Sequence, residues 1–326
     1  MFYYTNKRKR NKKIILIAGV VALAIALSVL IVVFSDNIAG WFSSSSEESD
    51  ASTGTPTAGV STPEPTPQKP LDETALTVAS RFGVPDGFER VSVENGSFGE
   101  FLRNYSLKAY GMVPKYYDGS DYLDVQTSGV LGQTLISRMQ NSPKAIMYLY
   151  AQYLYAQGAY DRISFNFYAG HTYTYSNYLK GQKYDSAQGG LYIPEDAVVS
   201  EPTEQNLRSY MIQVFIYANS QSLKTQLAAS NFQNIQVGDV LIEHGHAILV
   251  MDVCRNKTTG EVRFICAEAN SLTLEDEETG VKTTVVSDMY LLQDPETQSV
   301  WLTLEDDGTF VQGDKVYGAD CVRRFN

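Results

Sequence analysis

Two of the three histidines in the chain, His244 and His246, lie close together in the segment "GDVLIEHGHAILVMDV" at residues 238–253. A histidine that begins a strand, with an acid or amide beside it, supplies the base and its orienting partner in nucleophilic catalysis. The run from His246 to Cys254 is almost entirely apolar, which is typical of a central strand covered on both faces. The sequence therefore makes His246 the candidate base, and the alternative is a hydrogen-bonded histidine at a strand end.

The partner of His246 is predicted from the register of a hairpin. Residues 262–269 form a second apolar run, and "RNKTTG" between the two runs is a plausible turn. A hairpin centred near residues 258–259 places His246 opposite residues 270–271, within about one pair of both Glu268 and Asn270. Either side chain is a candidate to orient the histidine.

A nucleophile would have to come from another part of the chain. In papain-like enzymes it is a cysteine at the start of a helix, where the helix N-terminus lowers the thiol pKa. The corresponding helix here, residues 142–160, starts with Ser142. Ser142 followed by Pro143 is equally typical of a plain helix N-cap. Cys254, Cys266 and Cys321 lie on strands or near the C-terminus, where we expect small buried side chains or at most one disulfide.

A metal site is the second possible arrangement of candidate site residues. His244 and His246, with His171 as a third ligand, would make a three-histidine site. His244 lies in a predicted turn, so its ring need not share a face with that of His246. No spacing of the CxxC type is present, and we expect no cofactor.

The predicted elements give an α+β fold with helices first and an antiparallel sheet later. Helical spacing or helix-end signals predict helices over 73–83, 96–107, 142–160 (ended by Gly158) and 204–230, the last broken near Asn219. Strands are predicted over 161–169, 237–243, 246–254, 262–269 and 283–293.

The first 71 residues have a different character. "KRKRNKK" at 7–13 precedes 21 residues without a charge at 14–34, long enough to cross a membrane. The positive-inside rule then predicts a cytoplasmic tail (1–13), a single-pass transmembrane helix in the cell membrane (14–34) and an extracellular remainder. A cleaved signal peptide is the alternative.

Residues 35–71 are rich in Ser, Thr, Pro and Glu and predict a disordered linker that carries an extracellular globular domain, residues 72–326. Beyond residue 34 the chain has 20 Lys and Arg against 37 Asp and Glu, a net charge of −17. Such an acidic domain is a poor ligand for nucleic acid. We expect its partner to be peptidoglycan or another envelope component.

Four segments resemble, in order, a bacterial domain-of-unknown-function family, number 4846. They are "GSFGEFLRNYSLKAYG" (96–111), "AIMYLYAQYLYAQGAYDRISFNFYAG" (145–170), "IQVGDVLIEHGHAILVMDV" (235–253) and "DGTF" (307–310), so the resemblance spans about 95–325. More distantly, "GDV…GHAILV" is similar to the histidine strand of the NlpC-type and CHAP-type cell-wall hydrolases.

The distant resemblance implies a papain-like fold, with His246 as base and Glu268 or Asn270 as its orienting partner. The nucleophile would stand at Ser142, where the family often has cysteine. This departure favours a non-catalytic binding or scaffolding module of the envelope. The alternative is a peptidoglycan amidase or endopeptidase.

Overall fold

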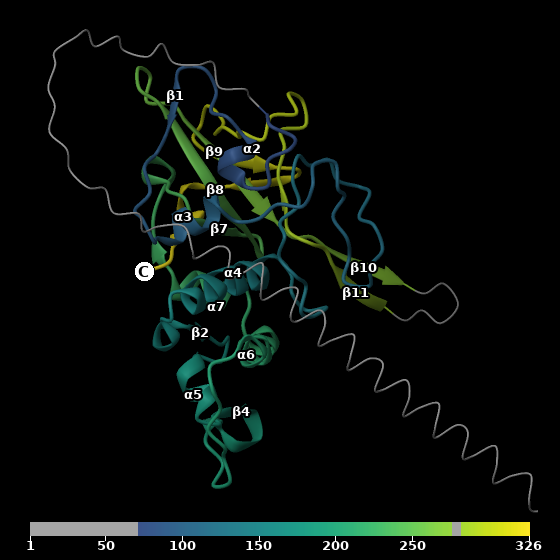
Figure 1. Ribbon diagram of the computed structural model, residues 1–326, viewed down its shortest axis with the longest axis vertical. Helices are drawn as coiled ribbons and strands as arrows, with labels where there is room; N and C mark the ends of the chain where they lie inside the picture. Colours follow the sequence, from purple (N-terminus) through teal and green to yellow (C-terminus); the bar gives the residue numbers. More distant parts are fainter. Residues whose placement is uncertain (1–70, 276–281) are drawn as a thin grey trace, which may run out of the picture. The chain divides into compact units, whose positions relative to one another are not determined.

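The computed structural model describes residues 71–275 and 282–326, which lie within one compact unit, Thr66–Asn326 (Figure 1). The predicted tail, transmembrane segment and nearly all of the linker fall outside the described residues. Among the helices that are described, none is both long enough and apolar enough to cross a membrane.

The described α-helices all lie between residues 78 and 226. They are α2 (Val78–Arg81), α3 (Phe98–Arg103), α4 (Ser142–Ala156), α5 (Tyr175–Leu179), α6 (Glu204–Tyr217) and α7 (Ser220–Gln226). Single 3-10 turns are η1 (Tyr160–Arg162), η2 (Ser186–Gln188), η3 (Phe232–Asn234) and η4 (Ala319–Cys321).

Seven of the described strands form one antiparallel sheet, in the order β12-β9-β8-β7-β15-β6, with β1 also pairing to β8. They are β1 (Phe88–Arg90), β6 (Ala228–Ala229), β7 (Val240–Glu243), β8 (His246–Asn256), β9 (Val262–Glu268), β12 (Tyr290–Leu291) and β15 (Val322–Arg324). The α+β prediction is therefore confirmed, although β1 joins the sheet from the helical part of the chain.

The remaining strands form separate two-stranded hairpins. They are β2 (Ser164–Asn166) with β3 (Thr172–Thr174), β4 (Lys183–Asp185) with β5 (Gly190–Tyr192), β10 (Ser271–Glu275) with β11 (Lys282–Val286), and β13 (Phe310–Gln312) with β14 (Lys315–Tyr317). The β10–β11 hairpin projects beyond the main sheet (Figure 1).

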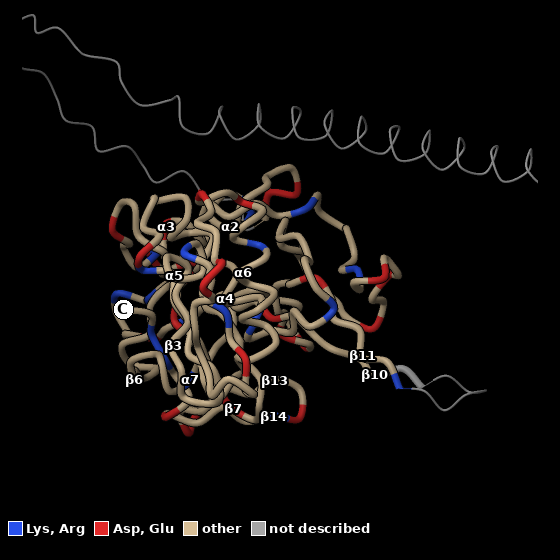
Figure 2. The backbone as a smooth tube through the Cα atoms, turned by 90° about the horizontal axis from the view of Figure 1, so that it is seen from below, with Lys and Arg blue, Asp and Glu red and all other residues tan. Residues whose placement is uncertain are grey.

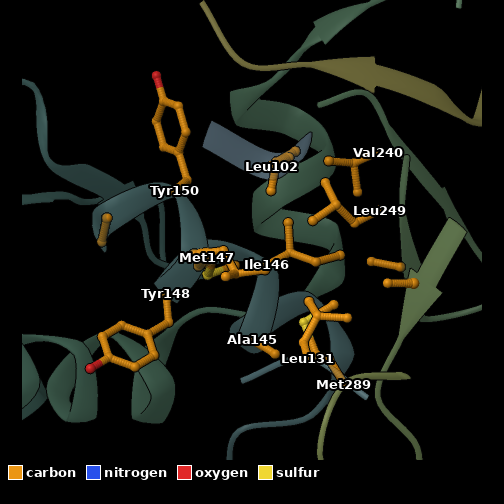
Figure 3. Packing of buried hydrophobic residues seen from close by; sticks show 14 of the residues in the cluster. Leu102, Leu131, Ala145, Ile146, Met147, Tyr148, Tyr150, Val240, Leu249 and Met289 are labelled. Atoms are coloured by element: carbon orange, nitrogen blue, oxygen red, sulfur yellow. The ribbon is translucent and has the colours of Figure 1, made fainter. Parts of the chain in front are cut away.

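Both faces of the main sheet are covered. On the first, which we call the helix face, Ile146 of α4 belongs to one buried cluster with Val240 and Leu249 (Figure 3). Leu149 of α4 is a member of the same cluster. On the second, the far face, Ile248 and its neighbours pack with side chains from the C-terminal segments. Double coverage explains why β8 is apolar on both sides.

The β8–β9 hairpin has the predicted centre, because Val253 pairs with Phe264. The register shifts between Val250 and Asp252, so β8 carries a β-bulge there. Met251 lies in the helix-face cluster and Val253 in the far-face cluster, so the bulge turns Asp252 toward the helices. Its carboxylate binds Arg103 of α3 at 2.7 Å and Arg90 of β1 at 2.6 Å.

Two predicted helices are much shorter than expected. The segment 73–83 is helical only in α2, because Phe82 forms an isolated bridge with Leu71. The segment 96–107 is helical only in α3, because the backbone of Leu107 bridges to Leu131. Long-range pairing therefore ends both helices early. The predicted break near Asn219 is confirmed, since Asn219 caps α7.

Candidate functional site

Three side chains form a hydrogen-bonded chain on the far face of the sheet, where β8 begins and β9 ends. Nε2 of His246 lies 3.0 Å from Oε2 of Glu268, and the hydroxyl of Tyr290 donates to Oε1 of Glu268 at 2.8 Å. Tyr290 stands directly opposite Glu268 in the β12–β9 pair. Burial, reinforced by the Glu268 carboxylate, raises the pKa of Tyr290 far above its usual value, so it remains a donor. The His246 side chain is 18% exposed.

Sequence reasoning expected either Glu268 or Asn270 beside His246, and the structure brings Glu268 there. The amide of Asn270 instead donates to the Tyr122 hydroxyl at 2.8 Å. Tyr290 was missed because the strand predicted over 283–293 is two separate strands. Tyr122 was missed because nothing local in a loop sequence indicates contact with a residue so distant in the chain.

Ser142 lies at the junction of α4 with the sheet and is fully buried. Its hydroxyl donates to the carbonyl of Ala247 at 2.5 Å and accepts from the N–H of Ala269 at 3.1 Å. The side chains of Ala247 and Ala269 belong to the helix-face cluster. The hydroxyl therefore bridges β8 to the residue after β9, just beyond their last pair, Leu249 and Ala267.

This arrangement corrects the predicted N-cap role of Ser142. The helix N-cap is Asn141, and Ser142 is the first helical residue, because its side chain bonds to the sheet instead of to the first turn of α4. Ser142 also does not pair with His246, whose Nε2 binds Glu268. In this structure the Ser142 proton is thus directed to a backbone carbonyl and not to the histidine.

The cysteines are buried and free, as expected for small apolar side chains. Burial raises the pKa of Cys254 and of Cys321 to about 12, and that of Cys266 well above its usual value. Since the thiolate is the nucleophile, none of these thiols is chemically activated.

We expect the native protein to be inert to a thiol reagent such as dithionitrobenzoate. All three cysteines should react after denaturation in guanidinium, which is the matched control on the same sample. Absorbance of the released thiolate measures both states. A native thiol that reacts as fast as a free small-molecule thiol would contradict this assignment.

The alternative three-histidine metal site is not formed. His171 contacts the ring of Tyr184, and Nε2 of His244 lies 2.7 Å from the carbonyl oxygen of Val316. His244 also occupies the two-residue turn between β7 and β8, with a positive φ of 51°, followed by Gly245 at 75°. Within residues 71–275 and 282–326, no group of three His, Cys, Asp or Glu is placed to hold a metal ion.

Three cavities of the described unit are lined by residues outside the His246–Glu268–Tyr290 chain. The largest, about 680 Å³, lies beside Phe98, Tyr150 and Phe325, and the others, about 410 Å³ and 380 Å³, lie beside Lys144 and beside Tyr184. His246 lines none of the three. The His246–Glu268–Tyr290 chain is thus a partly exposed polar cluster at the end of two strands.

The fold and this cluster define an α+β domain whose antiparallel sheet ends in a partly exposed His–Glu–Tyr chain. The protein belongs to the family described as domain of unknown function 4846, whose model matches residues 78–273. The match begins and ends earlier than the resemblance over 95–325 suggested, and it leaves out "DGTF". No curated protein and no solved structure matches the chain.

Proposed function

We propose that this protein is a non-catalytic binding module of the cell envelope, anchored in the membrane through residues 14–34 and exposed outside the cell. The burial of Ser142, with both of its hydrogen bonds directed to backbone atoms, is the observation that carries the non-catalytic part. The burial of the three cysteines supports the same conclusion, because it raises the pKa of each thiol and leaves none of them activated as a nucleophile.

We infer from the distant similarity of "GDV…GHAILV" to NlpC-type and CHAP-type hydrolases that the fold descends from a papain-like enzyme. A papain-like ancestor would have carried a base and an orienting acid where His246 and Glu268 now stand. In this chain the polar pair persists at 3.0 Å, while the position of the nucleophile has become part of the sheet contact.

The test uses the full-length protein in mild detergent with purified, insoluble peptidoglycan. We expect saturable co-sedimentation, and no new amino or carboxyl termini in the wall material by mass spectrometry. His246→Ala is expected to leave both results unchanged. Absence of saturable binding to peptidoglycan and to the other envelope polymers would reject the proposal.

A peptidoglycan peptide hydrolase is the second candidate, favoured by one observation. The His246 ring keeps a carboxylate partner and an exposed edge, which is the arrangement of an oriented base. Cleavage by the wild-type protein that disappears in His246→Ala, with the variant still folded by circular dichroism, would establish this candidate instead.

A further inference from the structure

A cavity of about 410 Å³ lies between the N-terminal end of α4 and the β10–β11 hairpin. Arg138, Lys144 and Lys282 line it, and none of its described lining residues is an acid. Hydroxyls of Ser271 and Thr284 stand in the same lining. We call this space the Lys144 cavity.

Lys144 has no carboxylate partner, unlike several other partly buried cations among the described residues. Arg103 is paired with Asp252, Lys108 with Asp288 and Arg324 with Asp239, each at 2.7 Å or less. No ion pair reaches Lys144 or Arg138 from any residue that the structure describes, and burial lowers the pKa of Lys144. A partly desolvated ammonium without a carboxylate is costly, and a bound anion would compensate it.

The charge of the surrounding protein limits the kind of anion. From residue 71 onward the sequence has 19 Lys and Arg against 32 Asp and Glu, a net charge of −13, and Figure 2 shows Asp and Glu distributed over the described unit with Lys and Arg between them. Such a field repels polyanions more strongly than a single charge, because the repulsion grows with the charge of the ligand. A monoanion such as a carboxylate therefore fits better than a phosphate polymer.

Asn141 indicates what else the ligand presents. As the N-cap of α4 it makes no side-chain capping hydrogen bond, and its Oδ1 is buried without a partner among the described residues. Asn141 belongs to the lining of the cavity, and a turn of its side chain would bring this oxygen out to accept a hydrogen bond from a ligand N–H or O–H. The C-terminal residue of a peptide carries an N–H next to its carboxylate, so one end group offers both interactions.

We propose that the Lys144 cavity binds the C-terminal carboxylate of a short peptide. The carboxylate pairs with Lys144 and Arg138, and the adjacent peptide N–H donates to Asn141. The inference rests on the proposed function only for the source of the peptide, which would be the cell wall.

The first experiment is isothermal titration of the full-length protein in mild detergent with N-acetyl-alanyl-alanine. We expect one saturable site, and a loss of about ten- to one-hundred-fold in affinity in Lys144→Gln, because a charged hydrogen bond is removed. The C-terminal amide of the same peptide is expected to show a similar loss. Lys180→Gln, which removes an equal charge from an exposed position at the end of α5, is the matched control.

Equal affinity of Lys144→Gln and wild type, or of the amide and the acid, would overturn the proposal, as would no binding at all. Tighter binding of inorganic phosphate, with displacement of the peptide, would replace carboxylate by phosphate as the ligand. Folding of the variant is not at risk, since an unpaired, partly buried charge is removed, and thermal unfolding checks this.

Co-sedimentation separates the inference from the proposed function. If Lys144→Gln still pellets with peptidoglycan as the wild type does, the module binds the wall elsewhere and the assignment of the cavity fails alone. If the peptide binds but the wall does not, the cavity assignment stands and the proposed function fails.

Discussion

Asp252→Ala is expected to lower the free energy of unfolding by about 3–5 kcal/mol, the largest effect of any single substitution we consider. Asp252 is fully buried and accepts from both Arg90 and Arg103. Removing the carboxylate leaves two guanidinium groups without their counter-ion, one of them on a residue only 8% exposed. Each also holds a backbone carbonyl, so neither is free to move into solvent.

Urea unfolding followed by circular dichroism measures this change. Asp121→Ala is the control, because Asp121 pairs with Lys115 at the surface, where both side chains are nearly half exposed. We expect less than about 1 kcal/mol for that substitution. A loss below 1 kcal/mol for Asp252→Ala would contradict this prediction. It would mean that the two arginines find other partners and that the ion pairs of Asp252 contribute little to stability.

Ser142→Ala is expected to lower the free energy of unfolding by about 2–4 kcal/mol. Two backbone groups, the carbonyl of Ala247 and the N–H of Ala269, lose their partner in a buried place, and each unpaired group costs about 1–3 kcal/mol. Ser142→Cys should also destabilise, since a thiol is a weak donor and a larger group. It is not expected to create hydrolytic activity.

The matched control for Ser142 is Ser186→Ala, at an exposed position in η2. It should change the unfolding free energy by less than about 0.5 kcal/mol. Equal stabilities for the two alanine variants would show that the hydroxyl does not bridge the strands. Peptide cleavage by Ser142→Cys would instead support the hydrolase alternative, with residue 142 at the position of the nucleophile.

Sequence alone predicts the part of the site that depends on a local pattern of apolar and turn residues. The β8–β9 hairpin is specified by two apolar runs and a turn between them, so its centre and the nearness of His246 to Glu268 follow, whereas the bulge that shifts its register does not. The single acid in "HAILVMDVC" is a signal that went unused, because a carboxylate in a buried strand requires a partner. Its two arginines could not have been named without the tertiary fold.

Ser142 and Lys144 illustrate what the sequence does not encode locally. A serine before proline is typical of an N-cap, and only the gap between β8 and β9 draws the hydroxyl away from that role. The Lys144 cavity depends on the β10–β11 hairpin, of which β10 was not predicted. Its five residues, SLTLE, alternate polar and apolar, so this strand signal was present in the sequence but was not used.

The Ser142 hydrogen bonds also bear on the order of events as the chain folds. They join residues 105 and 127 positions apart, and contacts of such long range slow folding because a large loop must close first. During synthesis α4 is complete well before β8 and β9 exist. Until residue 269 has emerged, the helix exposes an unpaired hydroxyl and the apolar face of Ile146 and Leu149, and nascent chains arrested in this interval are those most exposed to aggregation.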